Sequence, residues 1–288
     1  MSHILYVWGV AALMDGEVVV RIEDHDRQRS KPEYERGLLD DLDWLGFEPA
    51  NSISLGPSDF RQSDCDRTYA DALQDLASRN HVYRCVCTRK SLTKLRGPLR
   101  AGEVCYPGVC RDARHPESAA HGLRIAWPRG AAPEVFIDGL MGAQRQRPER
   151  QCGDLLLRNR LKQWTYQFAV TVDDIRHDVD FVVRGEDLLA STGRQVRLAR
   201  LLGRNEPPAF FHHPLVLDPA GVKLSKKQRA PSVRRLRESG VGPRKVLGEA
   251  AKAVGLVREA LDLEPCDVAD LVAKRHGGSL RVPGSCAA

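Results

Sequence analysis

The chain has 288 residues, of which 42% are hydrophobic and 28% charged, a composition typical of a globular protein with one large domain or two modest ones. No apolar run has the length of a bilayer-spanning helix, and residues 1–9 lack the basic segment of a cleavable leader, so we exclude membrane and secreted classes. The eight cysteines are not spaced like a disulfide framework, and we expect a reducing cytoplasm in which thiols are free to bind metal.

The net charge of +6 is concentrated in one part of the chain. Residues 221–258 hold eleven basic and two acidic residues, a net charge of +9, which leaves −3 for the remainder. A localised basic block is typical of a binding surface for nucleic acid or for a nucleotide phosphate chain. A solvated helix face has the same composition, and charge alone leaves both interpretations open.

Residues 1–83 have the patterning of an α/β unit. An apolar, helix-compatible run covers residues 4–14, and the β-branched run Val18–Ile22 is typical of a buried strand. The acidic cluster of residues 23–26 follows directly, where a parallel strand delivers side chains to a site at its carboxyl end.

The next two predicted elements are helices. The first begins at a capping box formed by Ser30 and Glu33 and ends at Gly46. Its inward positions recur at helical spacing: Tyr34, Leu38, Leu42 and Leu45. A second helix is expected over residues 63–77, and its inward positions are Tyr69, Leu73 and Leu76.

The remaining chain divides into three parts. In residues 84–150, cysteines, glycines, prolines and short extended segments replace helices, which indicates an inserted subdomain. Residues 151–203 return to helix and strand patterning. Residues 204–288 begin with a linker, continue into the basic block and a helical piece from 246 to 272, and end in a tail expected to be frayed. The expected elements are extended segments at 123–127 and 134–137, helices near 164–172 and 192–202, and a strand at 181–184.

Two pairs of metal-ligating residues occur in the inserted segment. Cys85 and Cys87 form the first pair, and the second combines Cys110 with either Cys105 or the phenol of Tyr106. Zinc prefers four soft or borderline ligands in a tetrahedron, and two close pairs held by turns supply them. A group of buried free thiols has the same spacing, so both interpretations stay open.

Four further residues have chemistry suited to a substrate. Lys223 and Lys226 lie on a glycine-flanked loop, where their ammonium groups are suited to neutralising a developing pyrophosphate. Arg184 ends a predicted strand next to a glycine and is placed to bind a carboxylate bidentately, and Tyr166 begins a predicted helix. Each of them, taken singly, also fits an ordinary surface role.

Taken in order, these segments resemble the catalytic half of the glutamyl-tRNA synthetases. The resemblance is carried by Arg21–Asp26, the Cys85/Cys87 and Tyr106/Cys110 pairs, Tyr166-Gln167, Val183–Leu188 and Lys223–Lys226, and it covers roughly residues 5–272. It is most specific to the short paralogues, the glutamyl-Q tRNA(Asp) synthetases, because no room remains after Lys226 for the helical anticodon-binding domain of the full-length enzymes.

The resemblance implies a fold and a reaction. The fold is an α/β, Rossmann-type core of class I aminoacyl-tRNA synthetases (1–83 and 151–203), interrupted by a zinc-binding subdomain (84–150) and followed by the lysine loop and a helical C-terminal region (204–288). The reaction is activation of glutamate by ATP, with Mg²⁺, and transfer of the glutamyl group to queuosine in the anticodon of tRNA(Asp). Two alternatives are a glutamate–tRNA ligase that charges tRNA(Glu) and a non-catalytic, zinc-containing tRNA-binding protein. We expect a cytoplasmic monomer.

The resemblance also implies roles for single residues. Glu23 would hold the substrate ammonium, Arg184 a substrate carboxylate, and Tyr166 would line the glutamate pocket. Lys226, helped by Lys223, would bind ATP and stabilise the departing phosphates. One structural zinc ion would be ligated by Cys85, Cys87, Tyr106 and Cys110, unless Cys105 displaces the phenol as the better ligand.

The chain departs from the family pattern at two places. Lys227 stands where a serine often follows the second lysine. More seriously, the opening strand and the His-x-Gly-His signature that cradles ATP are absent, since residues 1–5 match the middle of the signature helix. The loss would leave the strand at 18–22 unpaired on one side, so we expect either a start codon placed too late or a decayed copy, and a poor enzyme as written.

Overall fold

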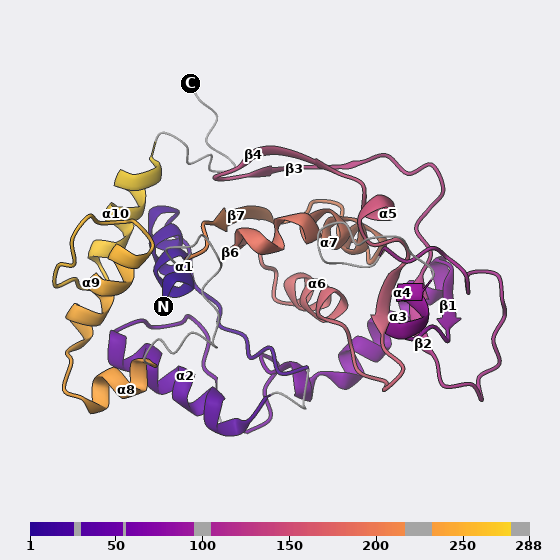
Figure 1. The fold of residues 1–288 in the computed structure, drawn as a ribbon, viewed down its shortest axis with the longest axis horizontal. Helices are drawn as coiled ribbons and strands as arrows, with labels where there is room; N and C mark the ends of the chain where they lie inside the picture. Colours follow the sequence, from indigo (N-terminus) through magenta and orange to yellow (C-terminus); the bar gives the residue numbers. More distant parts are fainter. Residues whose placement is uncertain (26–29, 54–55, 95–104, 217–231, 278–288) are drawn as a thin grey trace.

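The computed structural model describes residues 1–25, 30–53, 56–94, 105–216 and 232–277, which form an elongated α/β fold (Figure 1). The helices are α1 (Ser2–Leu13), α2 (Pro32–Leu45), α3 (Asp66–Arg79), α4 (Arg89–Lys94), α5 (Pro148–Gln151), α6 (Tyr166–Arg176), α7 (Leu189–Leu201), α8 (Val233–Glu238), α9 (Pro243–Ala253) and α10 (Asp267–His276). The strands are β1 (Val82–Cys85), β2 (Gly122–Ile125), β3 (Glu134–Asp138), β4 (Gly142–Gln146), β5 (Leu155–Arg158), β6 (Phe181–Gly185) and β7 (Ala209–His213). Short 3₁₀ turns cover Gln62–Asp64 and Glu186–Leu188.

The strands form two sheets. The larger one has the order β4-β3-β7-β6, in which β3, β7 and β6 are parallel and β4 closes an antiparallel hairpin with β3. The smaller one is antiparallel, in the order β1-β2-β5. The hairpin β3–β4 therefore belongs to the larger sheet although it lies within residues 84–150, and the smaller sheet takes β5 from beyond that segment.

Two apolar cores hold these layers together. One unites α1 and α2 with α9 and α10, and its fully buried side chains include Leu5, Leu45 and Leu247. The other lies between α3, α6 and the smaller sheet, where Leu76, Ile125 and Phe168 are fully buried. Figure 1 shows the corresponding division of the molecule, with α1, α9 and α10 at one end, α3, β1 and β2 at the other, and α6 and α7 between them.

Several predicted elements are confirmed. A helix covers residues 2–13, and α3 buries Tyr69, Leu73 and Leu76 as its periodicity predicts. Gly46 ends α2 with φ +80°, a left-handed conformation that favours glycine. The predicted helix near 192–202 begins earlier, at Leu189. The C-terminal helical piece is interrupted, because α9 and α10 are separated by residues 254–266.

The prediction of a buried strand at Val18–Ile22 is wrong. The segment is extended, but its only bridge to another described segment is a single parallel pair between Ile22 and Arg61, and Val19 is 40% exposed. The side chain of Asn51 occupies the place of a strand partner, since its amide donates to the Val20 carbonyl at 2.9 Å and its oxygen accepts from the Val20 N–H at 2.8 Å. A side chain that mimics a ladder satisfies the backbone without a sheet.

The predicted capping box of α2 is also wrong. The helix begins at Pro32, its N-cap is Lys31, and no described side chain caps it. Pro32 suits this position because its missing N–H is one that a helix start leaves unpaired. In the N-terminal half of α2, Glu35 faces inward and pairs with Arg61, whereas Tyr34 is 61% exposed, so only Leu42 and Leu45 of the predicted inward positions are buried.

In the part of the chain that the structure describes, every helix is too short or too polar to cross a lipid bilayer.

Candidate functional site

A buried arginine at the end of β6 organises the site. Arg184 donates hydrogen bonds from Nε to Nε2 of His212 (3.0 Å), from Nη1 to Oε1 of Gln195 (2.6 Å) and from Nη2 to Oγ1 of Thr192 (2.8 Å). Burial lowers the pKa of Arg184, and the nearby Tyr166 is the main group opposing that shift. Three of the five N–H donors are thus used for positioning, and the Tyr166 phenol is a further hydrogen-bonding partner of this guanidinium.

His212 is held so that it accepts a hydrogen bond from this arginine. β6 and β7 are parallel and in register, so Arg184 pairs directly with His212. Nδ1 of His212 lies 2.6 Å from Oδ2 of Asp138, which assigns the proton to Nδ1 and leaves Nε2 as the acceptor. Burial lowers the pKa of His212 and outweighs the effect of Asp138, so the ring is neutral near pH 7.

Asp138 closes this chain of contacts. Besides the His212 ring, it accepts from the backbone N–H groups of Leu140 (3.0 Å), Met141 (2.7 Å) and His212 itself (3.1 Å). Burial opposes ionisation of Asp138, but the hydrogen bonds from His212 and the backbone prevail and lower its pKa. The buried carboxylate is therefore fully satisfied and fixes the imidazole.

Glu23 lies in an arginine–aspartate network. It follows the Ile22–Arg61 bridge, and its Oε1 is 3.2 Å from Nη2 of Arg21, whose Nη1 donates to Asp174 at 2.7 Å. The Glu23 side chain is 38% exposed. It is therefore anchored on one side and open on the other, which suits a group that meets a cationic ligand.

Tyr166 lies within electrostatic range of both Glu23 and Arg184. Burial, followed by the charge of Glu23, raises the pKa of Tyr166 to about 12, and Arg184 acts on the same phenol in the opposite direction. Its neighbour Gln167 accepts from Nε2 of Gln195 at 2.8 Å, which links the first turn of α6 to the groups around Arg184. The phenol therefore stays protonated near neutrality and can donate a hydrogen bond.

The structure thus brings Glu23, Tyr166 and Arg184 into mutual electrostatic range, although they come from three distant segments. Chemically, they offer a carboxylate for an ammonium, a guanidinium for a carboxylate and a phenol donor. Lys223 and Lys226 lie outside the described residues. Sequence reasoning missed His212 and Asp138, because only the strand pairing reveals that they support Arg184.

The cysteines of the inserted segment form a second candidate site. The sulfur atoms of Cys85, Cys87 and Cys110 all lie within 4.8 Å of one another, and those of Cys87 and Cys110 are 3.6 Å apart. Tetrahedral zinc with Zn–S bonds of about 2.3 Å separates two thiolates by about 3.8 Å, so the spacing fits that ion. The cluster is a place where a metal ion could bind.

Tyr106 and Cys105, the two candidates for a fourth metal ligand, lie in different surroundings. The Tyr106 hydroxyl lies 3.6 Å from Cys85 Sγ and accepts from the Cys110 N–H at 2.8 Å, whereas Cys105 Sγ lies 3.7 Å from the carbonyl of Glu149. Gly153 permits this arrangement. Its φ of +65° is a left-handed conformation, in which its backbone forms a parallel β-bridge with Tyr106. A Cβ at this position would lie 1.9 Å from the Tyr106 carbonyl oxygen.

A buried arginine supplies positive charge beside the thiols. Nε of Arg124 donates to Cys85 Sγ at 3.3 Å, and its guanidinium lies 3.9 Å from the centre of the Tyr106 ring. Burial opposes ionisation of Cys85, but the contacts with Tyr106 and Arg124 outweigh it and lower the pKa of that thiol. Burial and the adjacent thiols raise the pKa of Cys87 to about 12.

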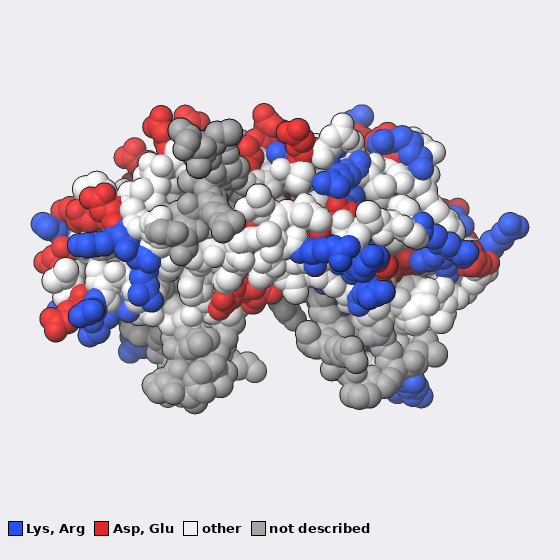
Figure 2. Space-filling view, turned by 90° about the horizontal axis from the view of Figure 1, so that it is seen from above, with Lys and Arg blue, Asp and Glu red and all other residues white. Residues whose placement is uncertain are grey.

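The basic block of the C-terminal region is partly neutralised where it is described. Arg234 pairs with Glu238 at 2.9 Å and Arg244 with Glu264 at 3.1 Å. On the face of Figure 2, basic and acidic side chains are interspersed, and basic ones are more frequent over the half that holds the three-stranded sheet. Two of its basic side chains are therefore paired with carboxylates, and residues 217–231 lie outside the described residues.

The Rossmann-like α/β fold with mixed sheets is that of the catalytic domains of class I tRNA synthetases. The family model of the tRNA synthetases class I (E and Q), catalytic domain, matches residues 2–260, and the chain belongs to this family. It is thus a ligase of the glutamyl-tRNA synthetase type, as predicted.

The similar proteins are of two kinds. A glutamyl-Q tRNA(Asp) synthetase of Nitratidesulfovibrio vulgaris is 37% identical over 279 residues, covering 93% of this chain and 85% of the relative. A glutamate–tRNA ligase 2 of Syntrophus aciditrophicus is 35% identical over 271 residues, covering 89% of this chain and 55% of the relative. The crystal structure of a glutamate–tRNA synthetase from Elizabethkingia anophelis has a TM-score of 0.74 at 24% identity, and the match covers 93% of this chain and 61% of that protein. The chain thus spans little more than half the length of the relatives named as glutamate–tRNA enzymes.

Proposed function

We propose that the chain activates glutamate with ATP and transfers the glutamyl group to queuosine in the anticodon of tRNA(Asp). The supporting observation is that Glu23, Tyr166 and Arg184, from three distant segments, lie within electrostatic range of one another, with Arg184 oriented by His212. The similarity to glutamyl-Q tRNA(Asp) synthetases over nearly the whole chain supports this acceptor.

The proposed roles follow from charge complementarity. The exposed edge of Glu23 binds the substrate ammonium, and the guanidinium of Arg184 binds a substrate carboxylate. The protonated phenol of Tyr166 donates a hydrogen bond to the bound amino acid. This set selects an amino acid with a second anionic group over a neutral one.

The proposed reaction has two steps. A carboxylate oxygen of glutamate attacks the α-phosphorus of ATP, forming glutamyl adenylate and releasing pyrophosphate, whose charge Lys226 and Lys223 neutralise. Mg²⁺ would accompany ATP and screen its phosphates. A hydroxyl group of queuosine then attacks the acyl carbon, the ester forms and AMP leaves.

The thiol cluster has a structural role in this proposal. Cys85, Cys87, Cys110 and the phenol of Tyr106 would hold one zinc ion, which would tie the loop around residue 110 to β1. Cys105 is not part of this set, because its sulfur faces Glu149.

The test is exchange of labelled pyrophosphate into ATP in the presence of glutamate and without tRNA. Exchange that depends on glutamate and is lost in Arg184→Lys supports the pocket. Arg145→Lys is the matched control, since Arg145 is exposed on β4. No exchange together with no glutamate binding by calorimetry would refute the proposal and favour the non-catalytic tRNA-binding protein.

A second candidate function is charging of the 3′ end of tRNA(Glu). It is favoured by the 35% identity with a glutamate–tRNA ligase and by the fold shared with glutamate–tRNA synthetases. The acceptor distinguishes the two. Incubation with labelled glutamate and each purified tRNA, followed by nuclease mapping, shows whether the label lies at the anticodon of tRNA(Asp) or at the 3′ end of tRNA(Glu).

A further inference from the structure

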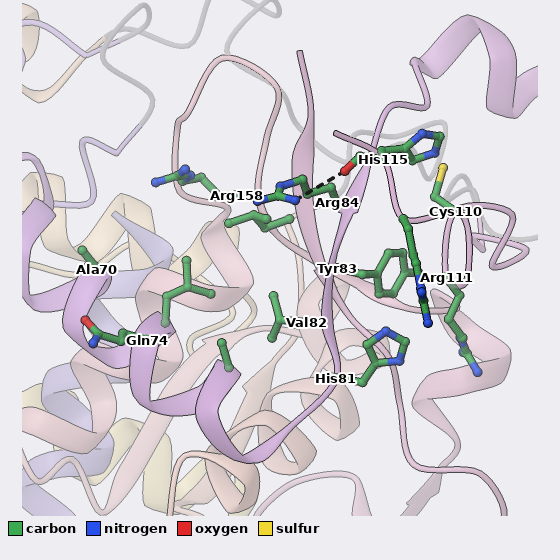
Figure 3. A pocket seen from close by; sticks show the side chains of 14 residues that line it. Ala70, Gln74, His81, Val82, Tyr83, Arg84, Cys110, Arg111, His115 and Arg158 are labelled. Atoms are coloured by element: carbon green, nitrogen blue, oxygen red, sulfur yellow. Dashed lines mark hydrogen bonds between the residues drawn. The ribbon is translucent and has the colours of Figure 1, made fainter. Parts of the chain in front are cut away.

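A cavity of about 690 Å³ opens at the end of the molecule farthest from α1. It lies between α3, β1, the end of β5 and the loop after Cys110, and shares no residue with the site around Arg184. Leu73 of α3 and Val82 of β1 contribute apolar surface to it. Figure 3 shows β1 running through its centre, with Gln74 on one side and Arg111 and His115 on the other.

The charges that line this cavity have one sign. Four of its fourteen lining residues are arginines and none of the fourteen is acidic: Arg84, Arg111, Arg114 and Arg158. The histidines His81 and His115 also line it. Surfaces elsewhere in the described residues mix the two signs, as the ion pair of α8 does. A concave surface of one sign attracts a polyanion more strongly than a flat mixed one.

The arginines differ in how far they are already paired. Arg111 donates from Nε to the buried carboxylate of Asp154 at 2.8 Å. Its charge is therefore already paired within the protein. Arg84 pairs with Glu117 at 3.4 Å, a carboxylate that is 85% exposed, and its Nη1 also donates to the His115 carbonyl at 3.4 Å (Figure 3). Among the described residues, Arg114 and Arg158 have no carboxylate within ion-pair distance; Arg158 instead faces the Trp164 ring at 5.4 Å.

We propose that this cavity binds a phosphate-bearing nucleotide unit, either free or as part of an RNA strand. Arg84, Arg114 and Arg158 contact the phosphates, and the apolar side chains of α3 and β1 receive the sugar or base. The volume is within the range of nucleotide-sized ligand sites, which bury an apolar body against a few oriented polar groups. Salt dependence is expected, because arginine–phosphate contacts release counterions.

The test compares two double variants with equal loss of charge. Arg114→Ala/Arg158→Ala removes two cations of the cavity, and Arg129→Ala/Arg145→Ala removes two exposed arginines outside it. Binding of a short fluorescein-labelled single-stranded RNA and of ATP is measured by anisotropy and calorimetry over a range of salt concentrations. Melting curves verify that both variants are folded.

We expect the cavity variant to lose at least about tenfold in affinity and its salt slope to fall by about 0.7 for each lost phosphate contact. The control should change less than about twofold. Loss for RNA alone identifies an RNA strand as the source of the phosphate, and equal loss for ATP at this site identifies a free nucleotide. Equal effects of the two variants on both probes would overturn the proposal. So would 4-thiouridine cross-links that avoid the peptides of α3, β1 and residues 110–115.

These measurements need neither glutamate activation nor glutamyl transfer. Failure of pyrophosphate exchange with intact cavity binding refutes only the proposed reaction, and the converse refutes only the cavity site.

Discussion

Replacing His212 by asparagine should weaken glutamate binding. The asparagine side chain keeps an amide that can donate to Asp138, but it is too short to accept from Nε of Arg184, which lies 3.0 Å from the ring nitrogen of His212. His212 is fully buried, so the freed N–H has no water to replace the ring. A buried hydrogen bond to a charged group contributes about 1.5–3 kcal/mol, which predicts a dissociation constant about 10- to 100-fold higher.

Glutamine at the same position is the informative partner variant. Its longer side chain places an amide oxygen closer to Arg184, and the three backbone donors to Asp138 remain. We therefore expect His212→Gln to bind glutamate better than His212→Asn. His121→Asn, outside this network, should match the unmodified protein.

The same contact predicts a pH dependence. Burial lowers the pKa of His212 below its ordinary value of 6.5, so the ring is neutral at pH 7 and binds a proton only below 6.5. The proton removes the acceptor for Arg184 and places a second cation beside it. Glutamate affinity should fall as the pH drops below 6.5, together with the stability linked to the neutral ring, which is fully present above that pH.

Isothermal titration with glutamate between pH 5.5 and 8 measures the glutamate affinity of each variant and how that affinity depends on pH. The reasoning is refuted if His212→Asn binds glutamate within about twofold of the unmodified protein, or if it keeps the same loss of affinity at low pH. Circular dichroism and a melting curve for each variant separate a lost contact from a lost fold.

Two further predictions concern metal and packing. Cys87→Ser should abolish stoichiometric zinc and lower the melting temperature, whereas Cys105→Ser should retain both, as measured by elemental analysis and calorimetry; equal zinc loss in the two variants would contradict the assignment of Tyr106. Gly248→Ala should destabilise the fold by about 3 kcal/mol or more, because its Cβ would lie 1.6 Å from the Leu261 carbonyl oxygen, while Gly37→Ala, with open space in α2, should stabilise it by about 0.5–1 kcal/mol. Chemical unfolding measures both, and a tolerated Gly248→Ala would show that the segment after α9 moves freely.

Helical periodicity predicted the buried positions correctly where a helix packs against a core along its whole length. Tyr69, Leu73 and Leu76 are buried as their spacing predicts, since one face of α3 meets one core. The same rule failed for Tyr34 and Leu38, because α2 meets the apolar core only near its C-terminal end, and its first turns contact the rest of the protein through the Glu35–Arg61 ion pair. Spacing records which residues share a face, but it does not record how far a neighbouring element extends.

Motif order predicted which residues form the candidate site, and their proximity could be checked in the structure. Glu23, Tyr166 and Arg184 come from the residues that carry the family resemblance, and the structure brings them into range of one another. The cysteines behave in the same way, since Cys85, Cys87 and Cys110 gather in space.

The sequence by itself determined the family and the helices with a continuous apolar face, and it predicted which residues form the candidate sites. Only the tertiary structure decided which groups support them: His212 behind Arg184, Asn51 beside Val20, and Tyr106 rather than Cys105 next to the thiols. The reason is that these contacts depend on strand register and on a left-handed turn at Gly153. Such pairings join segments far apart in the chain, and local spacing carries no trace of them.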